Sequence, residues 1–455
     1  MTESPVVSLN EVEVHFSDTD FIDKLLRRQG DVVKAVDGVS LDISENEVIA
    51  LVGESGCGKT TLGKTAIGLQ RPTDGSITYR GQDIWDINDG ASDAGISFEE
   101  IRRSLQIIHQ DPGSSLNANR TVLSCLSDPL KRWQPELGTE EREAMIYQLL
   151  ERVGMKPVED YASRFPHQLS GGEKQRVVLG RALLMSPDLI LADEAVSALD
   201  VSLRVEMMDL MLELQDLIDT SFLFISHDFS NARYFAEKAN GRIGIMYLGN
   251  LVEIGPAAEV LQHPKHPYTK VLSWATPYLD PDRAQQAQID EPPVRDIDIP
   301  DPMNPPSGCR FHTRCPSVIP PDDITIEQET YNEVMDYRER MEEGAFDPES
   351  VWERTDSTSD DIEAFKRHLF DDLFTHDLSG ENRAVVERSF EAFAKDDEEK
   401  AADLLRERFE SVCETVEPTL QDWEHPAACH LYDDSGIENI NSIPRTDTST
   451  EAPTD

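Results

Sequence analysis

The stretch Gly53-Glu-Ser-Gly-Cys-Gly-Lys59-Thr60 matches G-x-x-x-x-G-K-[ST], the pattern of a loop that cradles phosphates. The apolar run Val48–Val52 before it predicts a buried strand, and a helix is expected from Lys59 to about Leu69. Glycines let successive N–H groups face the phosphates, and the helix N-terminus adds its positive dipole end. A chance match would not explain this context. The predicted nucleotide-binding residues are Gly53, Glu54, Ser55, Gly56, Cys57, Gly58, Lys59, Thr60 and Thr61.

A second motif lies far along the chain. Leu189–Ala192 reads as another buried strand, and two carboxylates, Asp193 and Glu194, follow it. Asp193 is expected to hold Mg²⁺ together with the hydroxyl of Thr60. Glu194 is placed to act as the general base that polarises the attacking water. Two surface acids after a strand are the alternative, but that reading leaves the upstream loop unexplained.

A third motif, Leu169-Ser170-Gly171-Gly172-Glu-Lys-Gln175-Arg176, puts a hydroxyl and two glycines at a helix start. Such a terminus is ready to bind an anion. A second anion-binding helix start has no role in an ATPase whose single site is complete within one chain. It has a role if it binds a nucleotide that a partner subunit supplies. A simple glycine helix cap is the alternative.

With these motifs in order, residues 6–320 resemble the ATP-binding cassette (ABC) family. Residues 169–176 look like its signature motif, and Ser197-Ala-Leu-Asp200 looks like its D-loop. Gln110 in Ile108-His-Gln-Asp-Pro112 resembles the Q-loop glutamine, and His227 in Ile225-Ser-His-Asp228 resembles the switch histidine. Phe16 stands where the family places an aromatic that stacks on adenine, although a strand-core phenylalanine is also consistent.

The resemblance implies an α/β P-loop ABC fold, with a core sheet, an antiparallel β part and a helical subdomain. It implies a head-to-tail pair of cassettes with two ATPs between them, each gripped by one subunit's loop and the other's Ser170–Gly172. His227 would contact the γ-phosphate. Gln110 would be a third residue at Mg²⁺, beside Thr60 and Asp193, and would sense the ion and water. Gln175 and Asp200 are assigned to the same nucleotide site. Ala195, where relatives usually carry proline, removes no functional group.

Other segments resemble cassettes of di- and oligopeptide importers. They are Gln110-Asp-Pro-Gly-Ser-Ser-Leu-Asn117, Met246-Tyr-Leu-Gly249, His266-Pro-Tyr-Thr269 and Pro305-Pro-Ser-Gly-Cys309-Arg-Phe-His-Thr-Arg-Cys315-Pro316. The implied partners are a second cassette, identical or different, two transmembrane permease subunits and an extracellular solute-binding protein. The chain would then lie on the cytoplasmic face of the membrane. Nickel or sugar as the solute, or a soluble ABC ATPase in DNA repair or translation, are the alternatives.

The predicted organisation is an ABC nucleotide-binding domain at 5–262, with its helical subdomain at about 112–166. A cysteine module follows at 263–320 and 406–440, split by an acidic helical insertion at 321–405, and residues 441–455 form a disordered tail. Strands are expected at 6–16, 75–79, 222–225, 243–247 and 250–254, and helices over 121–161 and 201–218. No run of about 18 apolar residues occurs, so no membrane span is expected.

The cysteine module carries four thiols, those of Cys309, Cys315, Cys413 and Cys429. Disulfides are rare in a reducing cytosol, where clustered cysteines suggest metal or redox chemistry. The resemblance favours a [4Fe–4S] cluster. Zinc and unmetallated buried thiols stay open, with His430 as an alternative ligand.

The net charge is the other unusual feature. The chain has 42 basic and 88 acidic residues, which gives a formal charge of −46. Such a surface repels bare nucleic acid, so nucleic acid is excluded as a partner. Self-repulsion would destabilise the fold unless salt screens it, because the Debye length falls to about 3 Å at 1 M. We therefore expect a halophilic host; a solvated acidic tail is the alternative.

Overall fold

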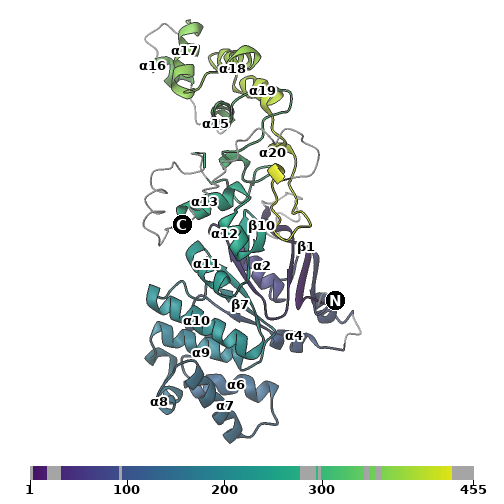
Figure 1. Cartoon of the computed structure of the whole chain (residues 1–455), viewed down its shortest axis with the longest axis vertical. Helices are drawn as coiled ribbons and strands as arrows, with labels where there is room; N and C mark the ends of the chain where they lie inside the picture. The colour runs from purple at the N-terminus through teal and green to yellow at the C-terminus, as the bar shows by residue number, and fades with distance from the viewer. Residues whose placement is uncertain are drawn as a thin grey trace, which may run out of the picture. The chain divides into compact units, whose positions relative to one another are not determined.

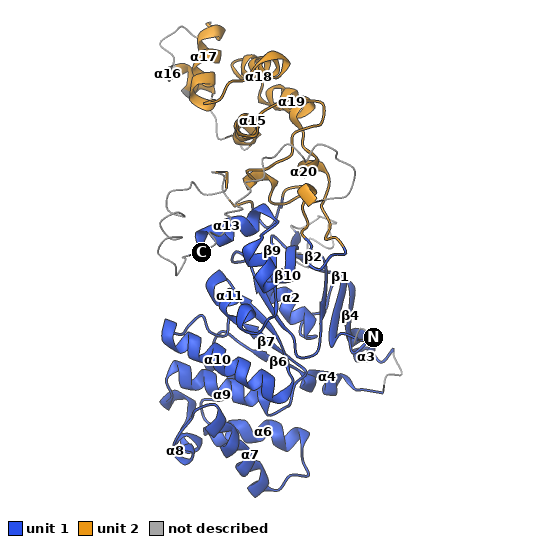
Figure 2. Ribbon diagram, in the orientation of Figure 1, with its two compact units in different colours: residues 1–291, 301–305, 422–426 blue, residues 292–300, 306–421, 427–455 orange. Residues whose placement is uncertain are grey.

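The computed structural model describes residues 4–17, 32–91, 95–276, 294–295, 299–342, 344, 348–354 and 361–432. The chain divides into two compact units (Figure 2). Unit 1 comprises residues 1–291, 301–305 and 422–426, and unit 2 comprises the rest. No described helix combines the length and the apolarity that crossing a membrane requires. The tail predicted at 441–455 lies outside the described residues, as do residues 433–440.

A six-stranded sheet forms the core of unit 1, in the order β10-β9-β3-β8-β7-β6. Figure 1 labels two of its strands, β7 and β10. Its strands are β3 (Val48–Val52), β6 (Leu105–Ile108), β7 (Leu189–Asp193), β8 (Ser221–Ser226), β9 (Arg242–Tyr247) and β10 (Asn250–Pro256). All pairs are parallel except β9 with β10. The strands expected at 222–225, 243–247 and 250–254 are confirmed as β8, β9 and β10. The strands β3, β7 and β8 are wholly buried, as their apolar runs predict.

The register of these parallel strands fixes where the chemistry lies. Val52 at the end of β3 pairs with Ser226 at the end of β8, and Asp193 at the end of β7 pairs with Ile225. The segments that follow the three strands therefore leave the sheet at one common edge. The phosphate loop, Glu194 and His227 all begin there.

A second, antiparallel sheet has the order β2-β1-β4-β5. Its strands are β1 (Val7–Ser17), β2 (Val32–Ile43), β4 (Asp74–Tyr79) and β5 (Gln82–Asp83). The strands predicted at 6–16 and 75–79 are confirmed as β1 and β4, and β2 was not predicted. The pairing of β1 with β2 shifts register several times between Leu9 and His15.

Helices complete unit 1. They are α2 (Lys59–Ala66), α3 (Ile84–Asn88), α4 (Phe98–Ser104), α5 (Pro112–Ser115), α6 (Val122–Trp133), α7 (Thr139–Arg152), α8 (Val158–Ser163), α9 (Gly171–Leu183), α10 (Val201–Ile218), α11 (Phe229–Lys238), α12 (Ala257–Gln262) and α13 (Pro267–Ala275). The helices expected within 121–161 and 201–218 are confirmed. In the helical part, α6 packs against α7, α8 and α9, and α9 also contacts α10.

The first helix is shorter than predicted. It ends at Ala66 because Gly68, with φ 66°, adopts the left-handed conformation that commonly terminates helices. The backbone N–H of Leu69 then turns back to the carbonyl of Lys64 at 2.8 Å. Within the helix, a Cβ on Gly63 would lie 2.6 Å from Leu191, so glycine allows α2 to approach the sheet closely.

Unit 2 contains α15 (Gln328–Glu342), α16 (Pro348–Arg354), α17 (Ile362–Leu373), α18 (Gly380–Phe393), α19 (Glu398–Phe409) and α20 (Val412–Thr415). Despite their acidic sequence, these helices bury their own apolar core, which includes Tyr337, Phe365, Phe390, Phe393 and Phe409. At the base of the helical stretch, Ser411 Oγ donates to the carbonyl of Ile319 at 2.6 Å, and Cys309 N–H donates to the carbonyl of Cys413 at 2.8 Å.

One of the predicted boundaries cuts through a structural element, and another divides unit 1. The limit between 405 and 406 falls inside α19, which forms one continuous helix. The limit at 262/263 separates α13 from unit 1, although the Tyr268 ring of α13 packs on Tyr247 with centroids 4.7 Å apart. Unit 1 therefore continues past residue 262.

Candidate functional site

The phosphate loop joins β3 to α2, and its shape requires glycine. Gly56 and Gly58 have φ values of 82° and 103°, in the region that favours glycine. A Cβ on Gly58 would lie 1.9 Å from the carbonyl oxygen of Ala35, and a Cβ on Gly53 would lie 2.1 Å from that of Met246. The neighbouring backbone therefore leaves no room for a side chain at either Gly53 or Gly58.

Lys59 places its charge inside this loop. Its side chain is 5% exposed, and Nζ donates to the carbonyls of Gly53 and Glu54, both at 2.8 Å. Burial raises the pKa of Cys57, whose sulfur lies 3.6 Å from the same ammonium. Cys57 is thus a packed, protonated thiol, and the loop offers ligands its backbone and one buried cation.

Two of the three residues predicted to bind Mg²⁺, Thr60 and Asp193, are in direct contact. Thr60 Oγ1 donates to Asp193 Oδ1 at 2.7 Å, although the two lie 133 positions apart. Asp193 is 8% exposed at the end of β7. A hydroxyl and a carboxylate are the hard oxygen donors that Mg²⁺ prefers, so the pair fits this ion.

Glu194 has an unusual backbone conformation beside this pair. Its φ is 50°, a region that non-glycine residues rarely adopt, and its N–H donates to the carbonyl of Ile225 at 3.1 Å. Its carboxylate meets His227 Nδ1 at 3.1 Å and accepts from Gln110 Nε2 at 3.1 Å. Gln110 also donates to Ser197 Oγ at 3.4 Å. The structure thus gathers the predicted base, switch histidine and Q-loop glutamine.

A cavity of about 550 Å³ opens in front of these groups, and Thr60, Gln110, Asp193 and Glu194 line it. The lining residues that were not predicted as site residues are Lys64, His109, Asp111, Ser114, Ser115 and Arg181. Lys64 follows Thr60 by one helical turn, a spacing that places both on one face. Burial lowers the pKa of His109, and the positive charge of Lys64 adds to the effect. Lys64 and Arg181 bring two positive charges to a lining that also carries the carboxylates of Asp111, Asp193 and Glu194.

The signature segment forms the predicted helix start. Ser170 is the N-cap of α9 and accepts from the N–H of Glu173, whose carboxylate bonds back to the N–H of Ser170. A Cβ on Gly171 would meet nothing within 4 Å, so this position is open to a ligand. Gln175 differs from the prediction of nucleotide contact. It is 2% exposed, and its Nε2 donates to the carbonyl of Ala195 at 2.6 Å.

Gln175 therefore supports the loop that follows Glu194 and does not face solvent. Asp200 is exposed and caps α10 by accepting from the N–H of Leu203. Phe16, near the end of β1, is 45% exposed, so its ring is available for stacking.

A buried tyrosine braces the phosphate loop from α13. Tyr268 is fully buried, and its hydroxyl accepts from the N–H of Glu54 at 3.0 Å. Burial raises the pKa of Tyr268 far above its usual range, so the hydroxyl stays neutral. No sequence motif predicted this contact.

Unit 1 also contains a buried carboxylate that bonds to the residues at the start of α13. Glu253 on β10 accepts from the N–H groups of Lys265 and His266 at 2.9 and 2.8 Å and meets His425 Nε2 at 2.6 Å. Burial raises the pKa of Glu253, but the hydrogen bonds, led by that from His425, outweigh this effect and lower it overall. Residues 422–426 are thus anchored in unit 1.

The four cysteines of the predicted module all belong to unit 2, where Cys315, Cys413 and Cys429 are buried and Cys309 is partly exposed. Burial raises the pKa of Cys315 well above its usual range, and Cys309, Cys429 and Cys413 raise it further by their charge. The thiols are thus near neighbours. Among the described residues, however, no three of their sulfurs lie within 4.8 Å of one another. A preformed zinc tetrahedron would hold them about 3.8 Å apart at Zn–S bonds of about 2.3 Å.

Family models match three parts of the chain. Residues 36–197 match the model described as ABC transporter. Residues 252–320 match the oligopeptide/dipeptide transporter C-terminal region. Residues 328–426 match a domain of unknown function, DUF8228. The last of these contains the described helices of unit 2.

Relatives agree with these models. The chain is 42% identical over 294 residues to the oligopeptide transport ATP-binding protein AppF of Bacillus subtilis, covering 65% of this chain and 84% of the relative. It is 39% identical to OppF of Salmonella typhimurium, an oligopeptide transport ATP-binding protein, covering 63% and 82%. It is 39% identical to the dipeptide transport ATP-binding protein DppF of Escherichia coli, covering 62% and 80%.

The phosphate loop, its paired carboxylates and these matches lead to one conclusion. The chain belongs to the ABC transporter family of ATP-hydrolysing subunits, in the branch of oligopeptide and dipeptide transport ATP-binding proteins.

Proposed function

We propose that this chain hydrolyses ATP to drive uptake of di- or oligopeptides through a membrane importer. The observation that carries the proposal is the contact between Thr60 and Asp193, beside the cluster of Glu194 with Gln110 and His227. Its relatives named for oligopeptide and dipeptide transport favour peptide over nickel or sugar as the solute.

Each residue has a role in the proposed reaction. Thr60 and Asp193 hold Mg²⁺, which neutralises developing phosphate charge when bound. Lys59 neutralises phosphate oxygens, and Glu194 takes the proton of the attacking water. Because the backbone N–H of Glu194 is anchored to Ile225, the carboxylate is aimed by the sheet edge itself. His227 and Gln110 hold the carboxylate's two oxygens.

The proposed complete site requires two cassettes. Gly171 is open and Ser170 is exposed at the start of α9, which suits them to grip the nucleotide of a second cassette. Two permease subunits and an external solute-binding protein complete the proposed importer, with this chain on the cytoplasmic face of the membrane.

Co-purification from the native host tests the assembly. A tagged chain solubilised in mild detergent should bring down a second cassette and two membrane subunits. Cells carrying Lys59→Ala should lose uptake of a labelled tripeptide, whereas nickel and sugar uptake should not change. A chain that stays free of membrane subunits would contradict the importer, and loss of nickel or sugar uptake instead would reassign its solute.

The proposed domain limits are 5–262, with the helical subdomain at about 112–166, for the cassette, 263–320 and 406–440 for the cysteine module, and 321–405 for the acidic insertion. The DUF8228 match at 328–426 and the continuous helix α19 favour moving the end of the insertion past residue 405. Removing residues 320–410 should then leave ATP hydrolysis intact.

We further propose that the four cysteines hold a [4Fe–4S] cluster. Buried, mutually close thiols support it, and so do backbone N–H groups that donate to the sulfurs, such as Ser317 to Cys315 Sγ at 3.4 Å. Such hydrogen bonds are characteristic of cluster ligands. A cluster spreads its four thiolates over four irons, so it does not require sulfurs as close as mononuclear zinc does. Its cysteines would supply thiolate ligation and set its potential.

Anaerobic purification tests the cluster. Wild type should show broad visible absorption and bound iron, and Cys315→Ser should lose most of both. Cys125→Ser, which removes a buried thiol elsewhere, is the matched control. Colourless, iron-free wild-type protein would rule the cluster out, and stoichiometric zinc in its place would favour the zinc alternative.

Finally, we propose a halophilic host on the basis of the net charge of −46. Screening at molar salt would relieve the repulsion among acidic side chains. Thermal unfolding should therefore shift upward as KCl rises from about 0.1 M to about 1 M, where the Debye length falls from about 10 Å to about 3 Å. An unchanged midpoint would contradict this proposal.

A further inference from the structure

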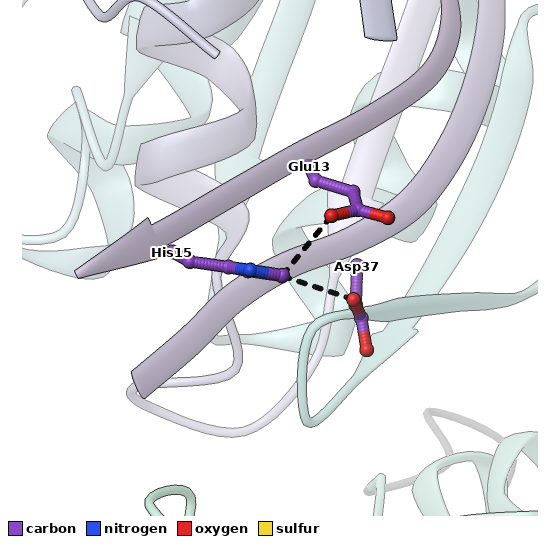
Figure 3. A group of neighbouring side chains, drawn as sticks. All are labelled: Glu13, His15 and Asp37. Carbon is purple, nitrogen blue, oxygen red and sulfur yellow. Dashed lines mark hydrogen bonds and ion pairs between the residues drawn. The ribbon is translucent and has the colours of Figure 1, made fainter. Parts of the chain in front are cut away.

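Three side chains from two strands converge at one end of the antiparallel sheet. Glu13 and His15 lie on β1, and Asp37 lies on the neighbouring strand β2 (Figure 3). His15 Nε2 is 3.0 Å from Asp37 Oδ1 and 3.6 Å from Glu13 Oε2. One ligand atom from each residue lies within 4.8 Å of the other two, the only such His/Cys/Asp/Glu group among the described residues.

The arrangement places two carboxylates on the same imidazole nitrogen. One N–H can donate a well-aligned hydrogen bond to only one of them. A divalent cation satisfies all three, because bonds of about 2.1 Å place adjacent ligand atoms roughly 3.0–3.4 Å apart. The observed 3.0 and 3.6 Å are close to these separations.

The surroundings hold the ligands in place before any cation binds. The N–H of His15 donates to Thr73 Oγ1 at 2.9 Å, and that of Asp37 donates to the carbonyl of Gly249 at 3.1 Å. Lys34 Nζ bonds Asp37 Oδ2 at 3.0 Å, which leaves Oδ1 toward His15. The side chains of His15 and Asp37 are 19% and 11% exposed, so the site is partly shielded yet accessible.

We propose that Glu13, His15 and Asp37 bind a divalent transition-metal cation of the zinc class, with water completing its coordination. One imidazole and two carboxylates form a donor set that zinc accepts. Mg²⁺ is disfavoured because it prefers oxygen-only octahedral ligands. This site is separate from the predicted Mg²⁺ ligands Thr60, Gln110 and Asp193.

A cation bound at Glu13, His15 and Asp37 would affect the nucleotide site. It would tie β1 to β2 beside Phe16, which pairs with Val33 across the two strands. The carbonyl of Ala35 on β2 lies against Gly58 of the phosphate loop. A bound cation therefore stiffens the strand ends that flank the nucleotide site, and nucleotide affinity should rise when it binds.

The test is a Co²⁺ titration of the metal-stripped full chain under reducing conditions. Because cysteine thiolates are also Co²⁺ ligands, the measured quantity is the difference between wild type and His15→Ala. Wild type should bind one more equivalent per chain, with a weak visible band of nitrogen–oxygen ligation that Zn²⁺ displaces and millimolar Mg²⁺ does not. His15→Ala should lose this equivalent and keep the thiolate bands.

Two further variants keep the result decisive. Glu13→Gln changes the most exposed ligand, at 36%, so it should fold even if His15→Ala does not, and it should weaken the extra site. His263→Ala, at an exposed histidine elsewhere, should retain every equivalent. Equal stoichiometry and affinity in wild type, His15→Ala and Glu13→Gln would overturn the proposal and leave the three residues as an ion-paired surface group.

Discussion

The hydroxyl of Tyr268 accepts a hydrogen bond from the backbone N–H of Glu54, at 3.0 Å, across 214 positions of the chain. Glu54 is the second residue of the phosphate loop, and its carbonyl also receives Lys59. The segment His266-Pro-Tyr-Thr269, which resembled peptide-importer cassettes for no visible reason, thus has a structural task. It fixes one end of the loop that holds the nucleotide.

Tyr268→Phe should weaken nucleotide binding more than turnover. The change leaves the N–H of Glu54 without its acceptor, which costs about 1 kcal/mol and loosens the loop. We expect KM for ATP to rise roughly fivefold while kcat stays within about twofold. Steady-state ATPase kinetics measure both.

Tyr234→Phe is the matched control, because it removes a hydrogen bond to Asp209 away from the loop. It should leave KM unchanged. If both variants alter KM equally, the effect is general destabilisation and Tyr268 has no special positioning role.

Thr60→Val should shift the Mg²⁺ dependence of the reaction to higher Mg²⁺ concentrations. Valine keeps the shape of threonine but removes the hydroxyl that contacts Asp193. Mg²⁺ affinity should fall by at least roughly tenfold, as it does when groups supporting a metal are removed. Thr60→Ser retains the hydroxyl and should behave as wild type. The measurement is ATPase rate against Mg²⁺ concentration, and identical curves for the valine and serine variants would remove Thr60 from the metal site.

Glu194→Gln should bind ATP and hardly hydrolyse it. Glutamine keeps a partner for His227 and Gln110 but cannot accept a proton, so the rate should fall roughly 100-fold or more. The dimer should then persist with ATP, which size-exclusion chromatography detects. Glu213→Gln, at an exposed acid on α10, is the control. Turnover within a few-fold of wild type would show that another group is the base.

Stability should fall as the pH drops from about 6.5 toward 4. Burial lowers the pKa of His266 to about 4 from its usual 6.5. The unfolded chain therefore takes up the proton first, and folding loses at most about 1.4 kcal/mol per pH unit across this window. Above pH 6.5 the contribution is fully present. Glu253, whose pKa is lowered by His425 and backbone N–H groups despite burial, adds a loss below its usual 4.5.

The variant His266→Asn isolates the contribution of His266 to the pH dependence of stability. An asparagine oxygen can accept the N–H of Tyr268, as His266 Nδ1 does at 3.1 Å, without titrating. Urea unfolding at pH 7, 6 and 5 should show a shallower decline for this variant than for wild type. His263→Asn should match wild type. Parallel declines in all three proteins would assign the pH dependence to other groups.

The sequence predicted the parts of the site whose chemistry is local. The glycines, Lys59 and Thr60 lie within one loop, and Asp193 ends an apolar strand, so a pattern of a few residues identifies each. The parallel register then brings them together without further information. The helix after the loop was predicted too long. It ends at a left-handed turn at Gly68, where the backbone hydrogen-bonds back to the helix, and residue composition does not reveal this turn.

Contacts between distant residues could not be read from the sequence. Strand β2 carries Asp37 and Gly38 and exposes five of its 12 residues, so only its pairing with β1 identifies it as a strand. Gln175 sits in a motif that suggests nucleotide contact, yet its partner is a carbonyl 20 positions away. The convergence of Glu13 and His15 with Asp37 depends on cross-strand register and has no marker along the chain.

The hydroxyl of Ser411 reaches the carbonyl of Ile319, and the backbone of Cys413 accepts from that of Cys309. The polypeptide thus departs before α15 and returns after α19 at nearly the same point. The intervening residues therefore form an insertion whose two ends are in contact. A gene can therefore gain or lose it in one event, because a short bridge rejoins the ends and the path of the chain around the cysteines need not be rerouted.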